Sequence, residues 1–182
     1  MNNQQFVNIA ASKIGLPYWY GTFGQIASEA LLEAKRKQYP SQYTADKIPT
    51  YRQQFGKQVF DCSGLLKYIL MTEGETKPLV YNAALDYSAD SFYQKATKKG
   101  DISTLPEIPG VALHRPGHIG IYAGNGKVIE ARGFAYGVVK SDLQGRGFLH
   151  WLYVPHVVYD TSAPDLHLIA DQLRTIANQL DH

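Results

Sequence analysis

The sequence predicts an α+β fold in which N-terminal helices pack on an antiparallel β-sheet, with a cysteine at the N-terminus of one helix. Two observations carry this expectation. Apolar residues recur at helical spacing through the first half of the chain, whereas β-branched and aromatic runs separated by glycine turns follow "LPEIPG" at residues 105–110. Helices first and strands afterwards is the order of an α+β domain.

Four segments of the first half are expected to be helical. Each combines apolar residues at helical spacing with a glycine, proline or capping residue at one end. The polar, proline-broken stretch at residues 40–58 is expected to lie on the surface with one helical turn at most. The predicted helices run over Asn3–Ile14, Ile26–Tyr39, Cys62–Met71 and Asn82–Lys98.

The second half is expected to form the strands. The candidate segments are "VALHR" at 111–115, "HIGIYAGNG" at 118–126, "KVIEAR" at 127–132 and "FLHWLYVPHVVY" at 148–159. The "GNG" of Gly124 to Gly126 lies between two such runs, and this pattern predicts a tight hairpin turn.

Composition excludes several classes of protein. The 182 residues are 45% hydrophobic and 19% charged, which suits one globular domain, and no apolar run is long enough to span a membrane. A net charge of +2 gives no basic field for nucleic acid. The single cysteine cannot form an internal disulfide. The N-terminus lacks the basic and apolar regions of a secretory signal, so we expect synthesis in the cytoplasm.

One domain is expected over residues 1–159, followed by a linker and a C-terminal amphipathic helix over 160–182. The helix is predicted from apolar residues spaced by 3, 4, 3 and 4, namely Leu166, Ile169, Leu173, Ile176 and Leu180. Two heptads are short for a coiled coil. Packing on the same chain and contact with a second copy or a partner therefore both stay open.

Cys62 is the candidate reactive group. A thiol at a helix N-terminus is favoured as thiolate, although a lone cysteine beside leucines is often a buried core residue. His118 begins a strand six residues before Gly124, and Glu130 follows Gly126 by four residues. Both should lie at the open end of one hairpin, where a carboxylate can orient an imidazole. Cys62, His118 and Glu130 would then supply a nucleophile, a base and an orienting group.

The segments "DCSGLLKY" and "HIGIYAGNGKVIEA", with "GLPYWYG" upstream, resemble the NlpC/P60 cysteine peptidases of bacterial cell-wall metabolism, whose fold is papain-like. The resemblance covers about Phe6 to Tyr159. It implies Cys62 as nucleophile, His118 as general base and, twelve residues further, Glu130 as the third polar residue. Many members have His, Asn or Gln at that position, so a carboxylate departs from the pattern. We expect it to extend the thiolate–imidazolium pair over a wider pH range.

The same resemblance implies substrate contacts by Tyr18, Asp61 and Ser63. Tyr18 matches a tyrosine that lines the site, and the other two can engage a stem-peptide amine. Helix capping by Asp61 and Ser63, and a core position for Tyr18, are the plain alternatives. An insertion at about residues 22–60 either borders the substrate groove or decorates the far side. The remaining histidines show no metal-binding spacing, so no metal or cofactor is expected.

The function implied is that of a peptidoglycan endopeptidase that cleaves the stem peptide between D-γ-glutamate and the diamino acid. The aromatic signature and the insertion look most like those of bacteriophage and prophage lysins that act on the bacterial cell wall. An amidase or cross-bridge peptidase resembling the CHAP domains is the nearest alternative. A non-catalytic wall-binding module and a toxin delivered into competitor cells are the others.

Overall fold

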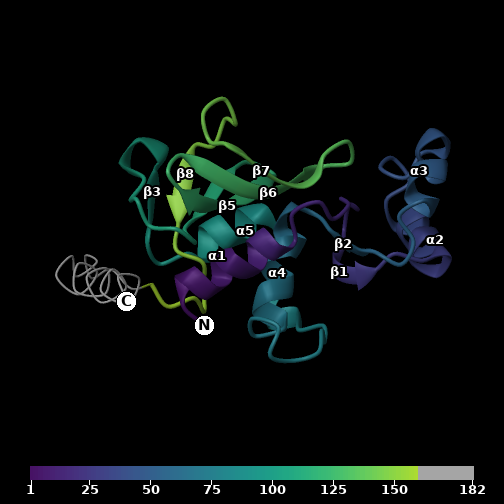
Figure 1. Cartoon of the computed structure of the whole chain (residues 1–182), viewed down its shortest axis with the longest axis horizontal. Coiled ribbons are helices and arrows are strands. Elements are labelled where there is room, and N and C mark those ends of the chain that lie inside the picture. The colour runs from purple at the N-terminus through teal and green to yellow at the C-terminus, as the bar shows by residue number, and fades with distance from the viewer. Residues whose placement is uncertain (160–182) are drawn as a thin grey trace, which may run out of the picture.

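The structure, a computed structural model, describes residues 1–159. The linker and amphipathic helix expected over 160–182, and the dimer or partner contact expected through that helix, lie outside the described residues. The α+β class is confirmed, because helices and antiparallel strands form separate layers (Figure 1).

The main sheet contains strands β3 (Lys99–Asp101), β4 (Ala112–Arg115), β5 (His118–Gly124), β6 (Lys127–Gly133), β7 (Gly137–Asp142) and β8 (His150–Leu152). Their order across the sheet is β3-β8-β4-β5-β6-β7, and every neighbouring pair is antiparallel. Helices α1 (Asn3–Ser12), α4 (Cys62–Met71) and α5 (Ala89–Lys95) pack on one face of this sheet (Figure 1). β5 and β6, which carry the predicted histidine and glutamate, therefore lie inside the sheet rather than at its edge.

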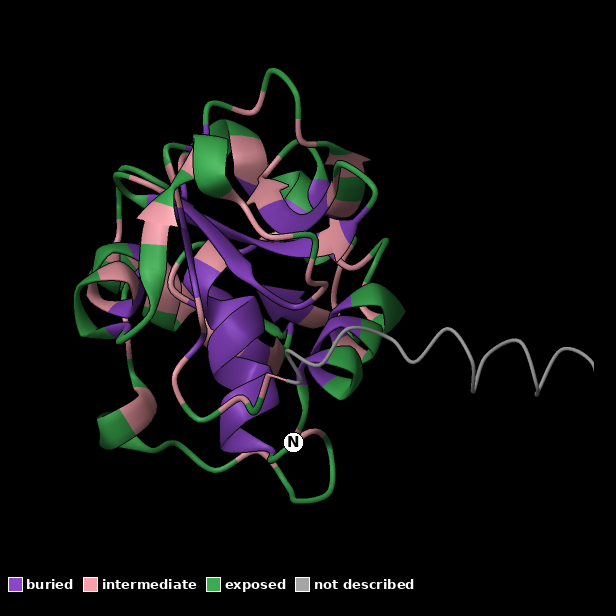
Figure 2. Cartoon of the chain, turned by 90° about the vertical axis from the view of Figure 1, so that its left-hand side faces the viewer, coloured by how far each residue is buried: buried purple, intermediate pink, exposed green. Residues whose placement is uncertain are grey.

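Each face of the sheet has its own hydrophobic cluster, as strand alternation requires. Ile119 and Ile129 point toward the helices, whereas Tyr122 and Val128 point away and are covered by loop residues such as Phe148. The buried residues in Figure 2 follow the strands and α4. His118 and Glu130 belong to the second face, where His118 stacks on Phe148 with ring centroids 5.7 Å apart.

Helix α4 is the buried central helix, with residues Ser63 to Met71 all buried. Asp61 caps it by accepting a hydrogen bond from the Gly64 backbone N–H at 2.5 Å. Gly64 has no room for a side chain, because a Cβ there would overlap the carbonyl oxygen of Thr22. This close approach fixes the first turn of α4 against the preceding loop, and Cys62 with it.

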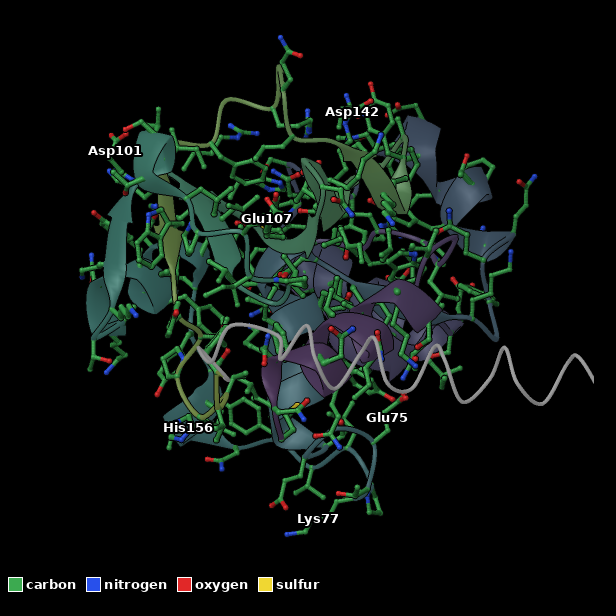
Figure 3. The ribbon with its side chains drawn as sticks, turned by 60° about the vertical axis from the view of Figure 1, so that its left-hand side comes forward. Glu75, Lys77, Asp101, Glu107, Asp142 and His156 are labelled. Atoms are coloured by element: carbon green, nitrogen blue, oxygen red, sulfur yellow. The ribbon has the colours of Figure 1, made fainter. Side chains whose placement is uncertain are left out.

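The turn predicted at Gly124 to Gly126 is confirmed. Asn125 and Gly126 have φ values of 52° and 65°, as a two-residue hairpin turn requires. Glu107, labelled in Figure 3, holds the turn by accepting hydrogen bonds from the Asn125 backbone N–H at 2.6 Å and from the Tyr122 hydroxyl. The hairpin register is thus fixed from outside the two strands.

Residues 22–60 form a small unit with its own core. Strands β1 (Phe23–Ile26) and β2 (Gln58–Phe60) pair antiparallel and enclose α2 (Glu29–Gln38), the 3₁₀ turn η1 (Ala45–Lys47) and α3 (Ile48–Arg52). Figure 1 shows α2 and α3 at the end of the molecule opposite β3. The core of this unit is built with the preceding Trp19 and consists of Trp19, Ala27, Leu32, Tyr43, Ile48, Tyr51 and Val59. The expectation of a surface stretch with one helical turn over 40–58 is therefore wrong, because this stretch contains η1 and α3 and buries three of these side chains.

Several predicted element bounds are wrong. The helix predicted from Ile26 begins at Glu29, because Ser28 caps it and Ile26 belongs to β1. The helix predicted over Asn82–Lys98 is a 3₁₀ turn η2 (Ala83–Leu85) followed by α5, since Asn82 and Ser88 each cap a new start. The strand predicted over 148–159 is confined to β8, and β1, β2, β3 and β7 were not foreseen.

Within residues 1–159, none of the helices combines the length and apolar character needed to cross a membrane.

Candidate active site

Cys62 lies at the first position of α4, beside the start of β5. Its thiol donates to the carbonyl oxygen of Gly117, with 3.9 Å between sulfur and oxygen. The backbone N–H of Ile119 is a hydrogen-bond donor toward the same sulfur, which lowers the pKa of the thiol. Residues 117 and 119 flank His118. The structure therefore brings Cys62 to the end of β5 that carries the predicted histidine, although 55 residues separate Cys62 from Gly117 in the chain.

His118 and Glu130 are hydrogen-bonded, with 2.6 Å between His118 Nε2 and Glu130 Oε2. The register pairs Ile121 with Ile129, so that Glu130 stands opposite Gly120 and His118 reaches it diagonally. A Cβ on Gly120 would lie 3.2 Å from both the Glu130 Cβ and a Phe148 ring carbon. The glycine between them therefore leaves the space in which the pair forms. Since Nε2 faces the carboxylate, Nδ1 is the ring nitrogen left for exchange with a reacting proton.

Arg146 is the residue at this site that sequence reasoning missed. Its Nε donates to Glu130 Oε1 at 2.6 Å and its Nη2 to Oε2 at 2.8 Å, while the Ser141 hydroxyl donates to Oε1 at 3.0 Å. Glu130 is fully buried, and a buried carboxylate needs a compensating cation. That requirement was the available signal, but several Arg and Lys residues in the β half could have met it.

The Glu130 carboxyl is held in its ionised form. Burial alone would raise its pKa, but the hydrogen bonds from Arg146 and His118, and the positive charges that come with them, lower it from 4.5 to about 2. Glu130 therefore accepts hydrogen bonds as a carboxylate over the whole neutral range. This arrangement fixes the tautomer of His118 with the proton on Nε2.

The surroundings of the Cys62 thiol favour its protonated form. Burial and then the charge of Asp61 raise its pKa to about 11, and the backbone N–H groups of Ile119, Ser63 and Cys62 act in the opposite direction with smaller effect. Burial and the charge of Asp61 therefore act against the thiolate that the helix N-terminus was expected to favour. The sulfur must lose its proton as it reacts, which requires a base beside it.

Asp90 fixes the turn that faces the sulfur. Its Oδ1 accepts a hydrogen bond from the Gly117 backbone N–H at 3.0 Å and lies 2.9 Å from His114 Nε2. The Gly117 hydrogen bond and then His114 hold the pKa of Asp90 below its usual value. Because Gly117 is also the neighbour of Cys62, this carboxylate links α5 to the reacting end of β5.

Asp61 and Ser63 are both buried and line the pocket of Cys62. Ser63 donates to Asp61 Oδ1 at 3.1 Å, and the Gly21 backbone N–H donates to Oδ2 at 2.9 Å. Burial raises the pKa of Asp61 despite these donors and the charge of Lys67. The capping interpretation of Asp61 is thus observed directly.

Tyr18 is half-buried, and its backbone forms an isolated parallel β-bridge with Phe60, the residue before Asp61. Burial raises its pKa, and the nearby charges of Cys62 and Asp61 raise it further. The Tyr18 hydroxyl therefore stays neutral, and Tyr18 is not among the residues that line the pocket of Cys62. Its core contacts are also present, because it packs against the main hydrophobic cluster.

The pocket of Cys62 has a volume of about 530 Å³ and is shared between two parts of the chain. Asp61, Cys62 and Ser63 line it, together with Gly117, which lies beside the sulfur. One wall comes from the segment before and at the start of α5, with Tyr81, Asp86, Ser88, Ala89 and Asp90. The inserted unit also lines the pocket, with Lys35 and Gln38 of α2 and the following Tyr39. Of the two open interpretations of the insertion, the structure agrees with the one in which it borders the groove.

An α+β domain with a helix-terminal thiol beside a carboxylate-bound histidine is the arrangement of the papain-like class. A sequence model of the NlpC/P60 family matches residues 49–156, which is more than half of the chain. The chain belongs to the NlpC/P60 family. Cys62, His118 and Glu130 fall within the matched residues, whereas Tyr18 and α2 precede them.

Curated relatives include the "probable endopeptidase p60" of Listeria innocua, 31% identical over 93 residues, and that of Listeria welshimeri, 32% identical over 98 residues. These matches cover 51% and 53% of this chain but only 18% and 17% of the relatives. The chain thus spans less than a fifth of the length of the curated relatives it matches.

Solved structures share the fold. The NlpC/p60 domain of the peptidoglycan hydrolase SagA superposes with a TM-score of 0.50 at 19% identity, over 85% of this chain and 100% of that one. NlpC2 from Trichomonas vaginalis gives a TM-score of 0.50 at 18% identity, over 84% of this chain and 46% of that one. The papain-like NlpC/P60 fold expected from the sequence is confirmed.

Proposed function

We propose that this chain is a cysteine endopeptidase that hydrolyses the stem peptides of bacterial peptidoglycan. One observation carries the proposal: the only thiol of the chain lies against the backbone on both sides of His118, whose other ring nitrogen is held by a buried carboxylate. Family membership and the relatives described as probable endopeptidases support the same activity.

The proposed reaction uses His118 as the proton carrier. As the Cys62 sulfur attacks the amide carbon, its proton passes to His118 Nδ1, and Glu130 stabilises the imidazolium through Nε2. The imidazolium then gives that proton to the leaving amine as the C–N bond breaks, which leaves a thioester. Water attacks the thioester while His118 accepts its proton. The C–S bond breaks, the sulfur regains the proton, and the new carboxyl group leaves.

Two groups at the start of α4 complete this proposal. The first backbone N–H groups of a helix have no partner inside the helix, so the N–H of Cys62 is positioned for the oxyanion that forms during attack. Asp61 and Ser63, which line the pocket, would hold the amine end of the substrate, and the neutral hydroxyl of Tyr18 would assist them.

We propose the bond between D-γ-glutamate and the diamino acid as the scissile bond, and a bacteriophage or prophage lysin as the biological setting. The resemblance of the aromatic loop and the insertion to lysins supports the setting. Genes for holins and phage structural proteins beside this one would agree with it, whereas an adjacent immunity gene and a secretion system would point to a toxin.

The test is mass spectrometry of the products released from purified sacculi by the wild-type chain and by Cys62→Ala. We expect fragments that end in D-glutamate and others that begin with the diamino acid, and neither with Cys62→Ala. Free lactyl-linked stem peptides would indicate an amidase instead. Clearing of the wall suspension that survives Cys62→Ala would overturn the proposal in favour of another site or a binding module.

A further inference from the structure

Lys35 is a cation that the inserted unit presents to the pocket of Cys62. It lies in the last turn of α2 and is half-buried. Its Nζ donates a hydrogen bond to Gln38 Oε1 at 3.1 Å and sits 5.6 Å from the centre of the Tyr39 ring. Both partners are neutral, and both line the same pocket.

The other charged groups of this pocket already have partners of their own. Lys67 pairs with Asp86 at 2.8 Å, and the Tyr81 hydroxyl donates to the second oxygen of Asp86. Asp61 and Asp90 each accept hydrogen bonds from backbone N–H groups, as described above. Among residues 1–159, Lys35 makes no salt bridge.

The surroundings of Lys35 favour an anion in the pocket. Partial burial removes water from the ammonium and lowers its pKa, and the charges of Asp61 and Asp86 only partly offset this effect. A desolvated ammonium with neutral partners gains most from a charged acceptor. Because the carboxylates of the pocket are engaged elsewhere, that acceptor has to come with the ligand.

We propose that Lys35 binds a carboxylate of the stem peptide and so makes the inserted unit a specificity element of the site. This inference rests on the proposed function. Two carboxylates lie near the bond proposed for cleavage: the α-carboxylate of D-glutamate, and the second carboxylate of diaminopimelate where that is the diamino acid. The pocket then takes a zwitterion, with the amine end near Asp61 and a carboxylate near α2.

The test measures binding in the Cys62→Ala background, where no ligand is consumed. The ligands are synthetic L-Ala–γ-D-Glu peptides, each with a C-terminal amide. They carry the D-glutamate α-group as carboxylate or carboxamide, and L-lysine or meso-diaminopimelate as the third residue. Calorimetry is run on chains with Lys35, Lys35→Arg, Lys35→Gln and Lys37→Gln. Lys37 is the matched control, because it is exposed on α2 and faces away from this pocket, beside Glu33 and Arg36.

With Lys35 we expect one carboxylate to tighten binding about tenfold over its neutral analogue. Lys35→Arg and Lys37→Gln should keep that preference, and Lys35→Gln should reduce it to less than twofold. Loss of the preference at D-glutamate identifies the α-carboxylate as the partner, and loss at the third residue identifies diaminopimelate. Equal binding of charged and neutral ligands with Lys35 present, or a preference unchanged in Lys35→Gln, would overturn the inference.

Turnover of the same peptides by the chain with Cys62 separates the two proposals. Binding that depends on Lys35 without cleavage would contradict the proposed function and leave the carboxylate site standing. Cleavage without any dependence on Lys35 would leave the endopeptidase standing and refute the carboxylate site.

Discussion

At the scale of single residues, Cys62 is unusual in combining a helix-terminal position with a raised pKa. The nearby carboxylate of Asp61 opposes the ionisation that the helix start would favour, and burial adds to this opposition. These surroundings favour the protonated thiol, and the proposed reaction uses His118 to take its proton.

This predicts slow alkylation of Cys62 at neutral pH. Iodoacetamide should modify the folded chain at pH 7 at least tenfold more slowly than a small free thiol, and the rate should rise with pH toward the pKa of about 11. Asp61→Asn keeps a capping oxygen but removes the charge, so it should speed alkylation at pH 8. Asp142→Asn, on the distant β7, is the control and should leave the rate unchanged. Fast alkylation at pH 7 in the wild type would contradict the prediction.

The buried pair of Arg146 and Glu130 yields a second prediction. Arg146→Met leaves a buried carboxylate without its cation, and we expect a loss of about 3 to 5 kcal/mol in the free energy of unfolding. Adding Glu130→Gln should recover part of that loss, because the double variant buries no charge. Urea unfolding of both single variants and the double variant measures this coupling. Additive losses would show that the two side chains do not act as a pair.

The lowered pKa of Glu130 decides how the stability of the fold changes with pH. The carboxylate stabilises the fold above the usual pKa of 4.5, and that contribution is lost as pH falls from 4.5 toward about 2. Glu130→Gln should therefore flatten the acid side of the curve of unfolding free energy against pH in this window.

For catalysis, Glu130→Gln should narrow the pH range of activity, since the amide cannot stabilise imidazolium as a carboxylate does. An unchanged pH–rate profile would refute this role.

Local patterns in the sequence brought His118 and Glu130 together, whereas Cys62 was joined to them by its helix start and by the resemblance to a known family. A strand start and a tight turn suffice for that pair, because the turn at Gly124 to Gly126 sets the distance along the hairpin, but the contact of Cys62 with Gly117 joins residues 55 apart in the chain. Arg146 and Phe148 could not be found in that way. They lie in the glycine-containing loop between β7 and β8, where no periodicity indicates which side chain points inward.

At the scale of elements, the helices were easier to predict than the short strands. Helix α4 was predicted with its observed bounds, because nine buried residues follow a clear capping residue. Strands β1, β2 and β3 have three or four residues each, too few to show an alternating pattern. They exist because partners distant in sequence pair with them, as β1 does with β2.

The position of α4 depends on the missing side chain of Gly64. We expect Gly64→Ala to lose about 1 to 3 kcal/mol in the free energy of unfolding, because the new methyl group meets the backbone oxygen of Thr22, which cannot rotate away. The rate of peptide hydrolysis should fall by more than the loss of folded protein explains, since the start of α4 carries Cys62. Ser63→Ala is the comparison for stability: it removes one hydrogen bond to Asp61 and should cost about 1 kcal/mol. A Gly64→Ala chain as stable as the wild type would show that the loop around Thr22 moves to make room for the methyl group.

At the scale of the whole molecule, the fold divides into the sheet with its helices and the inserted unit with a separate core. Both contribute to the pocket of Cys62, but only the first contains the proposed reacting groups. A cavity made in one core should therefore affect kcat and KM differently from a cavity made in the other.

Leu32 and Leu152 allow this to be tested with matched changes. Both are fully buried, Leu32 in α2 within the core of the inserted unit and Leu152 in β8 within the main core. Leu→Ala at either position should lower the free energy of unfolding of its own core by about 2 to 5 kcal/mol. Because α2 carries Lys35, Gln38 and Tyr39 to the groove, Leu32→Ala should raise KM for stem peptides several-fold with kcat nearly unchanged. Leu152→Ala, at a similar loss of stability, should leave KM unchanged at a temperature where both variants stay folded. An equal rise in KM for both variants would mean that the groove responds to general stability, and that the inserted unit does not shape it.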